Sequence, residues 1–269
     1  MTYDSAPHLG VSLDDDGVLR LRLDKPAKRN ALDDDMVAAL TNRVEEAGRD
    51  EAVRSILVEA AGDHFCSGFD IVGRNTGDAP RPRVGSIQRR LPSQAHGLIA
   101  LLCSVQVPVV CAARGWIAGI GLHLAAAADF TVVADDATVW EPFSQRGFTP
   151  DSGGTWLLPR LVGHQRAREL LVLGRRIDGA TAAEWGLVHR AVAGAEVDDV
   201  AGALARELAA GPTVALGLTK WLLHAGASAP LDEHLRNEAF AMELSSRSED
   251  FREGLEAFTE KRDPGFRGR

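Results

Sequence analysis

The stretch RGFTPDSGGTWLLPR, residues 146–160, carries one carboxylate, Asp151, between a proline and a Ser-Gly-Gly run. An aspartate just ahead of a helix is a favoured N-cap, because its side-chain oxygen accepts a hydrogen bond from an N–H group two or three residues further on. A carboxylate that faces a bound ligand can instead take up and return a proton as a general acid and base. Ser152 would cap the helix equally well, so capping does not require an aspartate. The local sequence therefore leaves both roles open for Asp151.

Two glycine-containing loops each follow a segment that is typical of a buried strand: FCSGFDI (65–71) and GWIAGIG (115–121). Ligands of open α/β sheets bind beyond the carboxyl ends of the strands, and glycine lets the backbone approach them closely. The second loop leads into a helical segment, whose first N–H groups favour negative charge. Two N–H groups that converge on one carbonyl oxygen form an oxyanion hole. Simple tight turns give the same glycine pattern, so the loops alone do not establish chemistry.

Alternating strands and helices must position these residues. The segment VLRLRLD (18–24) alternates apolar and polar residues, which predicts a half-buried strand in a hairpin with 9–13. The apolar segments 53–60 and 108–114 predict buried strands. From Asp33 the acidic first turn and the apolar spacing predict a helix.

The chain changes character twice along its length. Glycine, proline and arginine concentrate over 73–86, which predicts a mobile surface loop. From about residue 196 the pattern is almost wholly helical. We therefore expect an α/β fold in which residues 1–195 form the core with the ligand site and residues 196–269 form a helical C-terminal region.

Composition and charge exclude several classes of partner. The chain has 269 residues, of which 45% are hydrophobic and 25% charged, as in ordinary globular proteins. Its net charge of −8 argues against nucleic acid or an anionic membrane as the main partner. No apolar run approaches the roughly 18 residues that a membrane span needs. An anionic ligand would require a local basic cluster.

The cysteines and histidines indicate neither disulfides nor a metal. Three cysteines in apolar surroundings, Cys66, Cys103 and Cys111, suggest reduced thiols in a cytoplasmic protein, and the first ten residues lack the features of a secretory signal. The histidines are scattered without metal-ligand spacing, so we expect no metal site.

Six stretches together resemble the enoyl-CoA hydratase/isomerase family, the crotonase superfamily. In the order in which that family has them, they are RLDKPAKRNALD, HFCSGFDI, RGWIAGIGLHLAAAADF, GFTPDSGGTWLLPRLVG, RIDGATAAEWGLVHRAV and EAFTEKRDPGF. The resemblance covers nearly the whole chain. It implies a crotonase-like β-β-α spiral core, a helical C-terminal trimerisation region, and a homotrimer or dimer of trimers. It also implies an acyl-CoA thioester as substrate and no separate cofactor, since coenzyme A is part of the substrate.

The same resemblance assigns roles to individual residues. The backbone N–H groups of Phe69 and Ile120 match the oxyanion-hole donors, and Lys28 and Arg29 match groups that meet the CoA phosphates. Solvated surface charge is the competing interpretation for these two cations and for Lys261. The positions that the resemblance assigns to substrate binding are Lys28, Arg29, Ala31, Ser67, Asp70, Ile71, Phe258 and Lys261.

The chain departs from the hydratases at the two positions where those enzymes resemble one another in carrying glutamates. Here these positions hold His123 and Phe143, so water addition by a glutamate pair is not expected. An aspartate at position 151 instead resembles the isomerase and dehalogenase members. The likeness is closest to the ring-epoxide isomerase-like members of the phenylacetyl-CoA pathway, in PDSGGTWLLPR, EWGLV, GLTKWLL and RSEDFREGLEAFTEKRDP.

We therefore expect an enoyl-CoA isomerase in which Asp151 is the general acid and base. Phe143 should line the acyl pocket, and His123 should either face it or form a hydrogen bond at its wall. Three alternatives stay open: a hydratase in which His123 and Asp151 manage water, a dehalogenase-like or hydrolytic enzyme with Asp151 as nucleophile, and a non-catalytic acyl-CoA-binding protein.

Overall fold

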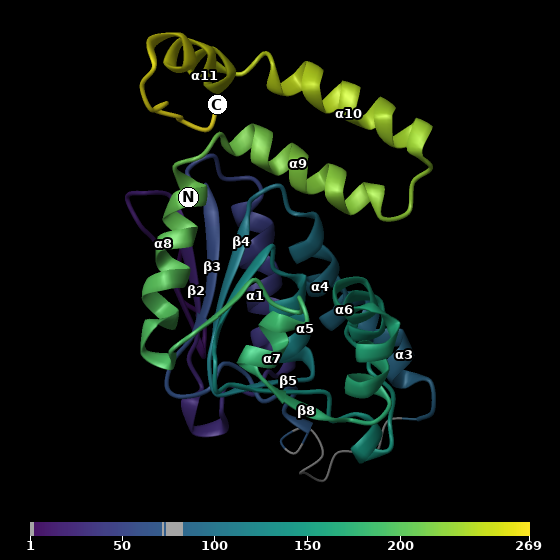
Figure 1. The fold of residues 1–269 in the computed structure, drawn as a ribbon. Coiled ribbons are helices and arrows are strands. Elements are labelled where there is room, and N and C mark those ends of the chain that lie inside the picture. The colour runs from purple at the N-terminus through teal and green to yellow at the C-terminus, as the bar shows by residue number, and fades with distance from the viewer. Residues whose placement is uncertain (1–2, 72, 74–82) are drawn as a thin grey trace.

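A six-stranded sheet forms the centre of the fold (Figure 1). The computed structural model describes residues 3–71, 73 and 83–269. Strand order is β1-β2-β3-β4-β6-β9, with β1 antiparallel to β2 and every other neighbouring pair parallel. The strands are β1 (Leu9–Leu13), β2 (Val18–Leu23), β3 (Ser55–Ala60), β4 (Val109–Ala113), β6 (Phe130–Ala134) and β9 (Arg190–Val192). Because five strands run parallel, their carboxyl ends meet at one edge, where ligand sites form.

A smaller sheet has the order β5-β7-β8. Its strands are β5 (Trp116–Ala118), β7 (Thr138–Trp140) and β8 (Arg176–Asp178). Successive strands of the chain divide between the two sheets: β4 lies in the larger and β5 in the smaller, and the same holds for β6 and β7. A helix follows each pair, α5 (Ile120–Ala127) and α6 (Gly154–Leu171). The expected β-β-α repeat is therefore present.

Helices cover both faces of the large sheet. In Figure 1, α8 and α1 flank it from opposite sides, and the Ser55 hydroxyl at the start of β3 donates a hydrogen bond to the Ala205 carbonyl oxygen of α8. All five residues of β4 are buried, as is usual for a parallel strand covered on both faces. The helices of the core are α1 (Asp34–Ala47), α3 (Ser86–Arg90), α4 (Ala95–Ser104), α7 (Gly179–Glu184) and α8 (Val197–Ala209).

Helix α1 begins where the sequence predicts it. The Asp33 carboxylate accepts a hydrogen bond from the Met36 N–H group at 3.0 Å, which caps the helix. Its buried face holds Met36, Leu40 and Val44, at helical spacing. The strands at 9–13, 18–23 and 109–113 also agree with the prediction. Most of the predicted surface loop, residues 74–82, lies outside the described residues, and the described part ends in the short helix α3.

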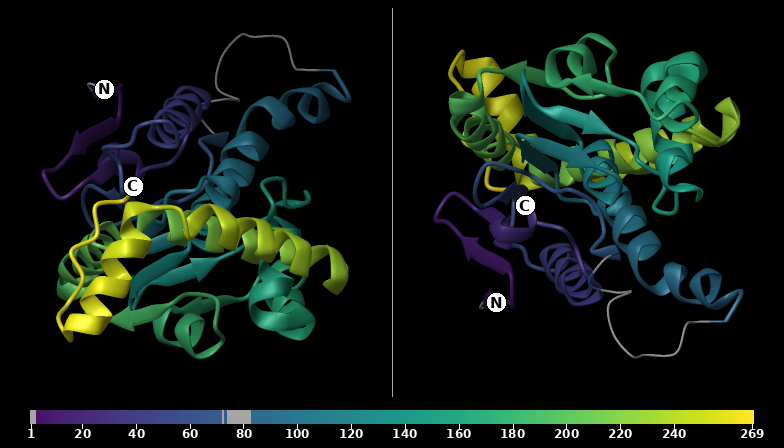
Figure 2. Two further views of the ribbon diagram at one scale, coloured as in Figure 1. Left: turned by 90° about the horizontal axis from the view of Figure 1, so that it is seen from above. Right: turned by 90° about the horizontal axis from the view of Figure 1, so that it is seen from below.

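Three further helices lie beyond the core: α9 (Thr213–Gly226), α10 (Leu231–Ser245) and α11 (Glu249–Glu260). Seen from above in Figure 2, α10 and α11 lie in front of the sheets. Large apolar side chains are exposed along them, including Leu223, Leu231, Leu235, Phe240, Met242, Leu255 and Phe258. No helix among the described residues is long and apolar enough to cross a membrane.

Candidate active site

The two glycine loops meet at the carboxyl edge of the large sheet. The Cys66 N–H group donates to the Trp116 carbonyl oxygen at 2.9 Å, and the Ala118 N–H group donates back to the Cys66 carbonyl oxygen. A β-carbon added to Gly119 would lie 3.8 Å from the Cα atom of Gly68. The φ angles are positive at both positions, 108° at Gly68 and 53° at Gly119, and such angles favour glycine. Sequence-distant backbone segments are thus brought into contact directly ahead of Phe69 and Ile120.

Ile120 is the first residue of α5, a helix whose eight residues are all buried. Gly119 stands at the N-cap and supplies no side-chain hydrogen bond. The first N–H groups of a helix have no partner within the helix, and the positive end of its dipole lies there. The start of α5 therefore offers an N–H group and a local field that suit a developing negative charge.

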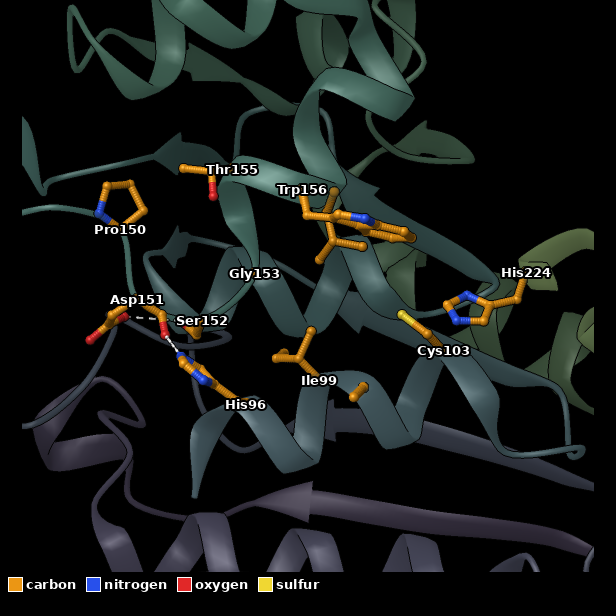
Figure 3. A pocket seen from close by; sticks show the side chains of 12 residues that line it. His96, Ile99, Cys103, Pro150, Asp151, Ser152, Gly153, Thr155, Trp156 and His224 are labelled. Carbon is orange, nitrogen blue, oxygen red and sulfur yellow. Dashed lines mark hydrogen bonds between the residues drawn. The ribbon is translucent and has the colours of Figure 1, made fainter. Parts of the chain in front are cut away.

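Asp151 lines a cavity of about 550 Å³ (Figure 3). Its walls come from α4, the segment before α6, the first turn of α6 and one residue of α9. In Figure 3, Asp151 and His96 lie at one end, and Cys103 and His224 at the other. Among the described residues that line this cavity, Asp151 is the only acidic one.

Asp151 does not cap a helix. Helix α6 starts at Gly154, its N-cap is Gly153 with a φ angle of 89°, and no side chain caps it. The Asp151 carbonyl oxygen accepts a hydrogen bond from His96 Nε2 of α4, and the Ser152 hydroxyl donates to Asp151 Oδ1 at 3.2 Å. Both contacts fix the residue at the cavity wall with its carboxylate half-buried.

His123 lies behind this wall. It is completely buried. The sequence left open whether His123 faces the acyl pocket or forms a hydrogen bond at its wall, and the structure has the hydrogen-bonded arrangement. Its Nδ1 atom lies 2.7 Å from Ser152 Oγ, and its Nε2 atom lies 2.9 Å from Glu141 Oε1. It does not line the described cavity. Phe143 is also buried and stacks parallel on the His123 ring, with ring centroids 5.9 Å apart.

The basic residues expected to meet CoA follow β2. Lys28 Nζ donates to Asp70 Oδ2 at 2.8 Å, and Lys25 Nζ lies 3.5 Å from the same oxygen. The hydrogen bond from Lys28 and one from the Gly73 N–H group hold the pKa of Asp70 below its ordinary value. The Arg29 guanidinium lies 5.7 Å from the ring centroid of Trp116.

The other expected binding residues of this region lie nearby. The Ser67 hydroxyl donates to the Lys28 carbonyl oxygen at 3.3 Å, and the Ile71 N–H group donates to the Phe69 carbonyl oxygen at 2.8 Å. Ala31 is buried next to Leu32, which accepts a backbone hydrogen bond from Asp70. Lys28, Arg29, Ala31, Ser67, Asp70 and Ile71 therefore form one region with the Phe69 loop.

Phe258 and Lys261 lie elsewhere. Phe258 on α11 is 84% exposed, and Lys261 ends that helix with a φ angle of 58°. The chain beyond α11 reaches Arg54, whose guanidinium donates to the Phe266 carbonyl oxygen at 3.2 Å just ahead of β3. This is the amino end of the large sheet, whereas Lys28 follows the carboxyl end of β2. One chain therefore does not bring Phe258 and Lys261 to the other binding residues.

Comparison with known proteins identifies the family. The enoyl-CoA hydratase/isomerase family model matches residues 14–269. The chain belongs to this family. It is 38% identical to the 1,2-epoxyphenylacetyl-CoA isomerase of Escherichia coli (strain K12), over 94% of this chain and 96% of the relative. It is 34% identical to the carnitinyl-CoA dehydratase of Citrobacter koseri, over 94% and 95%.

Solved structures of the family have the same fold. The enoyl-CoA hydratase of Bacillus anthracis superposes with a TM-score of 0.90 at 28% identity, covering 98% of this chain and all of that one. The predicted crotonase fold is therefore confirmed, and the relatives of this family member include both isomerases and hydratases by name.

Several residues of the site gave no signal in the sequence. Glu141 follows β7 two positions ahead of Phe143, and nothing in its local pattern marks it as a partner of His123. His96 and His224 reach the cavity from helices that are far apart in sequence. Tertiary packing rather than motif spacing therefore brings His96 and His224 to the cavity that Asp151 lines, and Glu141 to His123.

Proposed function

We propose that this enoyl-CoA hydratase/isomerase family member is an acyl-CoA isomerase in which Asp151 moves the proton. The observation that carries the proposal is the setting of the acidic side chains. Asp151 is the one acidic residue among the described cavity-lining residues, whereas Glu141 is completely buried. A carboxylate sealed from the cavity cannot reach a substrate carbon, so Asp151 is the group placed to do so.

In the proposed reaction, Asp151 takes a proton from a carbon near the thioester. The electron pair of the broken C–H bond moves into the acyl group, and negative charge develops on the thioester oxygen. The N–H groups of Phe69 and Ile120 hold that oxygen, and Asp151 returns the same proton to another carbon. General acid–base catalysis contributes roughly 10²–10⁴ to such a rate, and one oxyanion-hole donor roughly 10²–10³.

His123 and Phe143, which stand where hydratases carry glutamates, favour isomerisation over hydration. Hydration needs groups that hold and activate water, whereas His123 is engaged by Glu141 and Ser152 and Phe143 is apolar. The proton transfer proposed for Asp151 consumes no water. Ring-derived acyl groups are the first substrates to test, because the Escherichia coli relative is named for a phenylacetyl-CoA epoxide and the cavity has the apolar side chains of Ile99, Trp156 and Leu157 in its walls.

Coenzyme A would lie along the region of Lys28, Arg29, Ala31, Ser67, Asp70 and Ile71, with the two cations at its phosphates. Phe258 and Lys261 lie at the opposite end of the folded molecule, so they would reach the nucleotide from a neighbouring copy. The exposed apolar side chains of α9, α10 and α11 support an assembly of this kind, a homotrimer or a dimer of trimers. The three free cysteines support a cytoplasmic location.

The test is the Asp151→Asn variant, assayed with straight-chain, dienoyl and ring-derived CoA thioesters. We expect at least a 100-fold loss of kcat on every substrate that the wild type converts, with KM changed little. Asp199→Asn, an exposed substitution on α8, is the matched control. Equal rates for Asp151→Asn and the wild type would overturn the proposal. Label from isotopic water in the Asp151 carboxylate would indicate a nucleophilic mechanism instead.

A further inference from the structure

A chain of hydrogen-bonded side chains runs from the protein interior to Asp151. It starts at Glu141 after β7, passes through His123 of α5 and Ser152, and ends on Asp151 Oδ1. The three contacts measure 2.9, 2.7 and 3.2 Å. Glu141, His123 and Ser152 are each 0% exposed. Ser152 and Asp151 both border the cavity, whereas Glu141 and His123 do not. Figure 3 shows the last contact at the cavity wall.

The donors and acceptors fix the direction of this chain. An ionised Asp151 only accepts hydrogen bonds, so the Ser152 hydroxyl donates to it. The Ser152 oxygen therefore accepts from His123, which requires a proton on Nδ1. On the other side of the ring, one proton lies between His123 Nε2 and Glu141 Oε1. The Glu141–His123 pair is then neutral as a whole, which suits groups that are sealed from water.

The surrounding residues hold the His123 ring in place. Phe143 lies parallel to it, with an interplanar angle of 1°. A β-carbon at Gly154 would lie 2.2 Å from His123 Nε2, so the backbone at the start of α6 lies directly against the ring. The ring can neither tilt nor withdraw without displacing α6 or Phe143. Ser152 consequently receives its hydrogen bond from a fixed direction.

We propose that Ser152, oriented by His123 and Glu141, is the positioning residue for Asp151. Ser152 occupies Oδ1 and leaves Oδ2 as the oxygen that exchanges the proton with the substrate. The inference rests on the proposed function, because it needs Asp151 to be the base.

The decisive variants are Ser152→Ala, which removes the donor, and Ser152→Thr, which keeps a hydroxyl. We expect Ser152→Ala to lower kcat by about 10- to 100-fold with little change in KM, because the hydrogen bond that orients the Asp151 carboxylate is lost. Ser152→Thr should recover most of the lost rate. The other titratable side chains near Asp151 are His96, whose Nε2 atom donates to the Asp151 carbonyl oxygen, and Cys103 and His224 across the cavity. These are unchanged in both variants.

A second pair of variants tests the interior part of the hydrogen-bond series, at His123. His123→Asn keeps an N–H donor near the place of Nδ1, whereas His123→Leu has none. We expect the leucine variant to match Ser152→Ala in its loss of kcat at nearly unchanged KM, and the asparagine variant to stay nearer to the wild type. Thermal unfolding and binding of a saturated acyl-CoA, measured for all four variants, separate misfolded protein from mispositioned Asp151.

The double variant Asp151→Asn/Ser152→Ala separates this inference from the proposed function. If Ser152 acts through Asp151, then Ser152→Ala changes nothing further in the Asp151→Asn background. An inactive Asp151→Asn variant together with a Ser152→Ala variant of wild-type kcat would overturn the positioning role alone. Equal impairment of Ser152→Ala and Ser152→Thr in folded protein would also overturn it. A fully active Asp151→Asn variant would overturn the proposed function itself.

Discussion

The carboxylates of Asp151 and Glu141 have opposite surroundings. Asp151 is half-buried at the cavity wall, and one of its oxygens is held by Ser152. Glu141 is sealed in the interior, and its Oε2 atom has no hydrogen-bond partner within the described part of the chain. A buried acid needs partners, and His123 is the one that Glu141 has. At the scale of single residues, burial thus distinguishes the carboxylate of Asp151 at the cavity wall from that of Glu141 in the interior.

Gly154 offers a direct test of this packing. A β-carbon there would lie 2.2 Å from His123 Nε2, so Gly154→Ala must displace the ring or the start of α6. We expect a loss of about 1–3 kcal/mol of unfolding free energy, measured by urea denaturation, together with reduced kcat. Gly97→Ala on α4 is the control, because the nearest atom to its added β-carbon lies at 3.5 Å, and alanine is the better helix former. Equal stability of the two variants would contradict the described packing.

At the scale of elements, the site is built where strands end. The segment after β3 is held between the segment after β2 on one side and β5 on the other, through the bridges Leu32–Phe69 and Cys66–Ile117. Ion pairs fasten the same region, since Lys25 and Lys28 both approach Asp70. Backbone pairing sets the position of the Phe69 N–H group, and the charges hold the loop around it.

The Asp70 contacts predict how acid affects the loop. Because the folded pKa of Asp70 is lowered, its contribution to stability is present above its ordinary pKa of 3.8 and is lost as pH falls through the folded value. The difference in unfolding free energy between the wild type and Asp70→Asn should therefore shrink as pH is lowered from about 6 to about 3. Urea denaturation at several pH values measures it. Added salt should reduce the difference, since Lys28 is largely exposed. A difference that does not vary with pH would count against the ion pairs.

The elements differ in how far the sequence determines them. The helix from Asp33 and the buried strands were predictable, because capping, apolar spacing and strand patterning are local signals. The glycines of the two loops were predictable as well, since their positive φ angles favour that residue. The start of α6 was not. Asp151 and Ser152 both looked like caps, yet Gly153 occupies the N-cap. Contacts across the fold with His96 and His123 override the local preference.

At the scale of the whole molecule, the residues proposed to bind CoA are divided between two ends. Lys28 and the Phe69 loop follow the carboxyl ends of β2 and β3, whereas the tail beyond α11 contacts Arg54 ahead of β3. Figure 1 shows α11 at the end of the molecule opposite to β5 and β8. Under the proposed function, a site that uses both groups of residues would be completed by another copy of the chain.

Mixing two inactive variants tests this arrangement. One carries Asp151→Asn and the other a double change of Phe258→Ala and Lys261→Glu, which should raise KM for acyl-CoA strongly when it is present in every copy. In mixed assemblies, a site with an intact Asp151 can receive an intact α11 from a neighbouring Asp151→Asn chain. We expect unfolding and refolding the two together to restore a fraction of the wild-type activity that depends on their ratio. Each variant refolded alone is the control. If Phe258 and Lys261 served the site of their own chain, no mixed assembly would contain a complete site. Activity would then stay at the level of the separate variants.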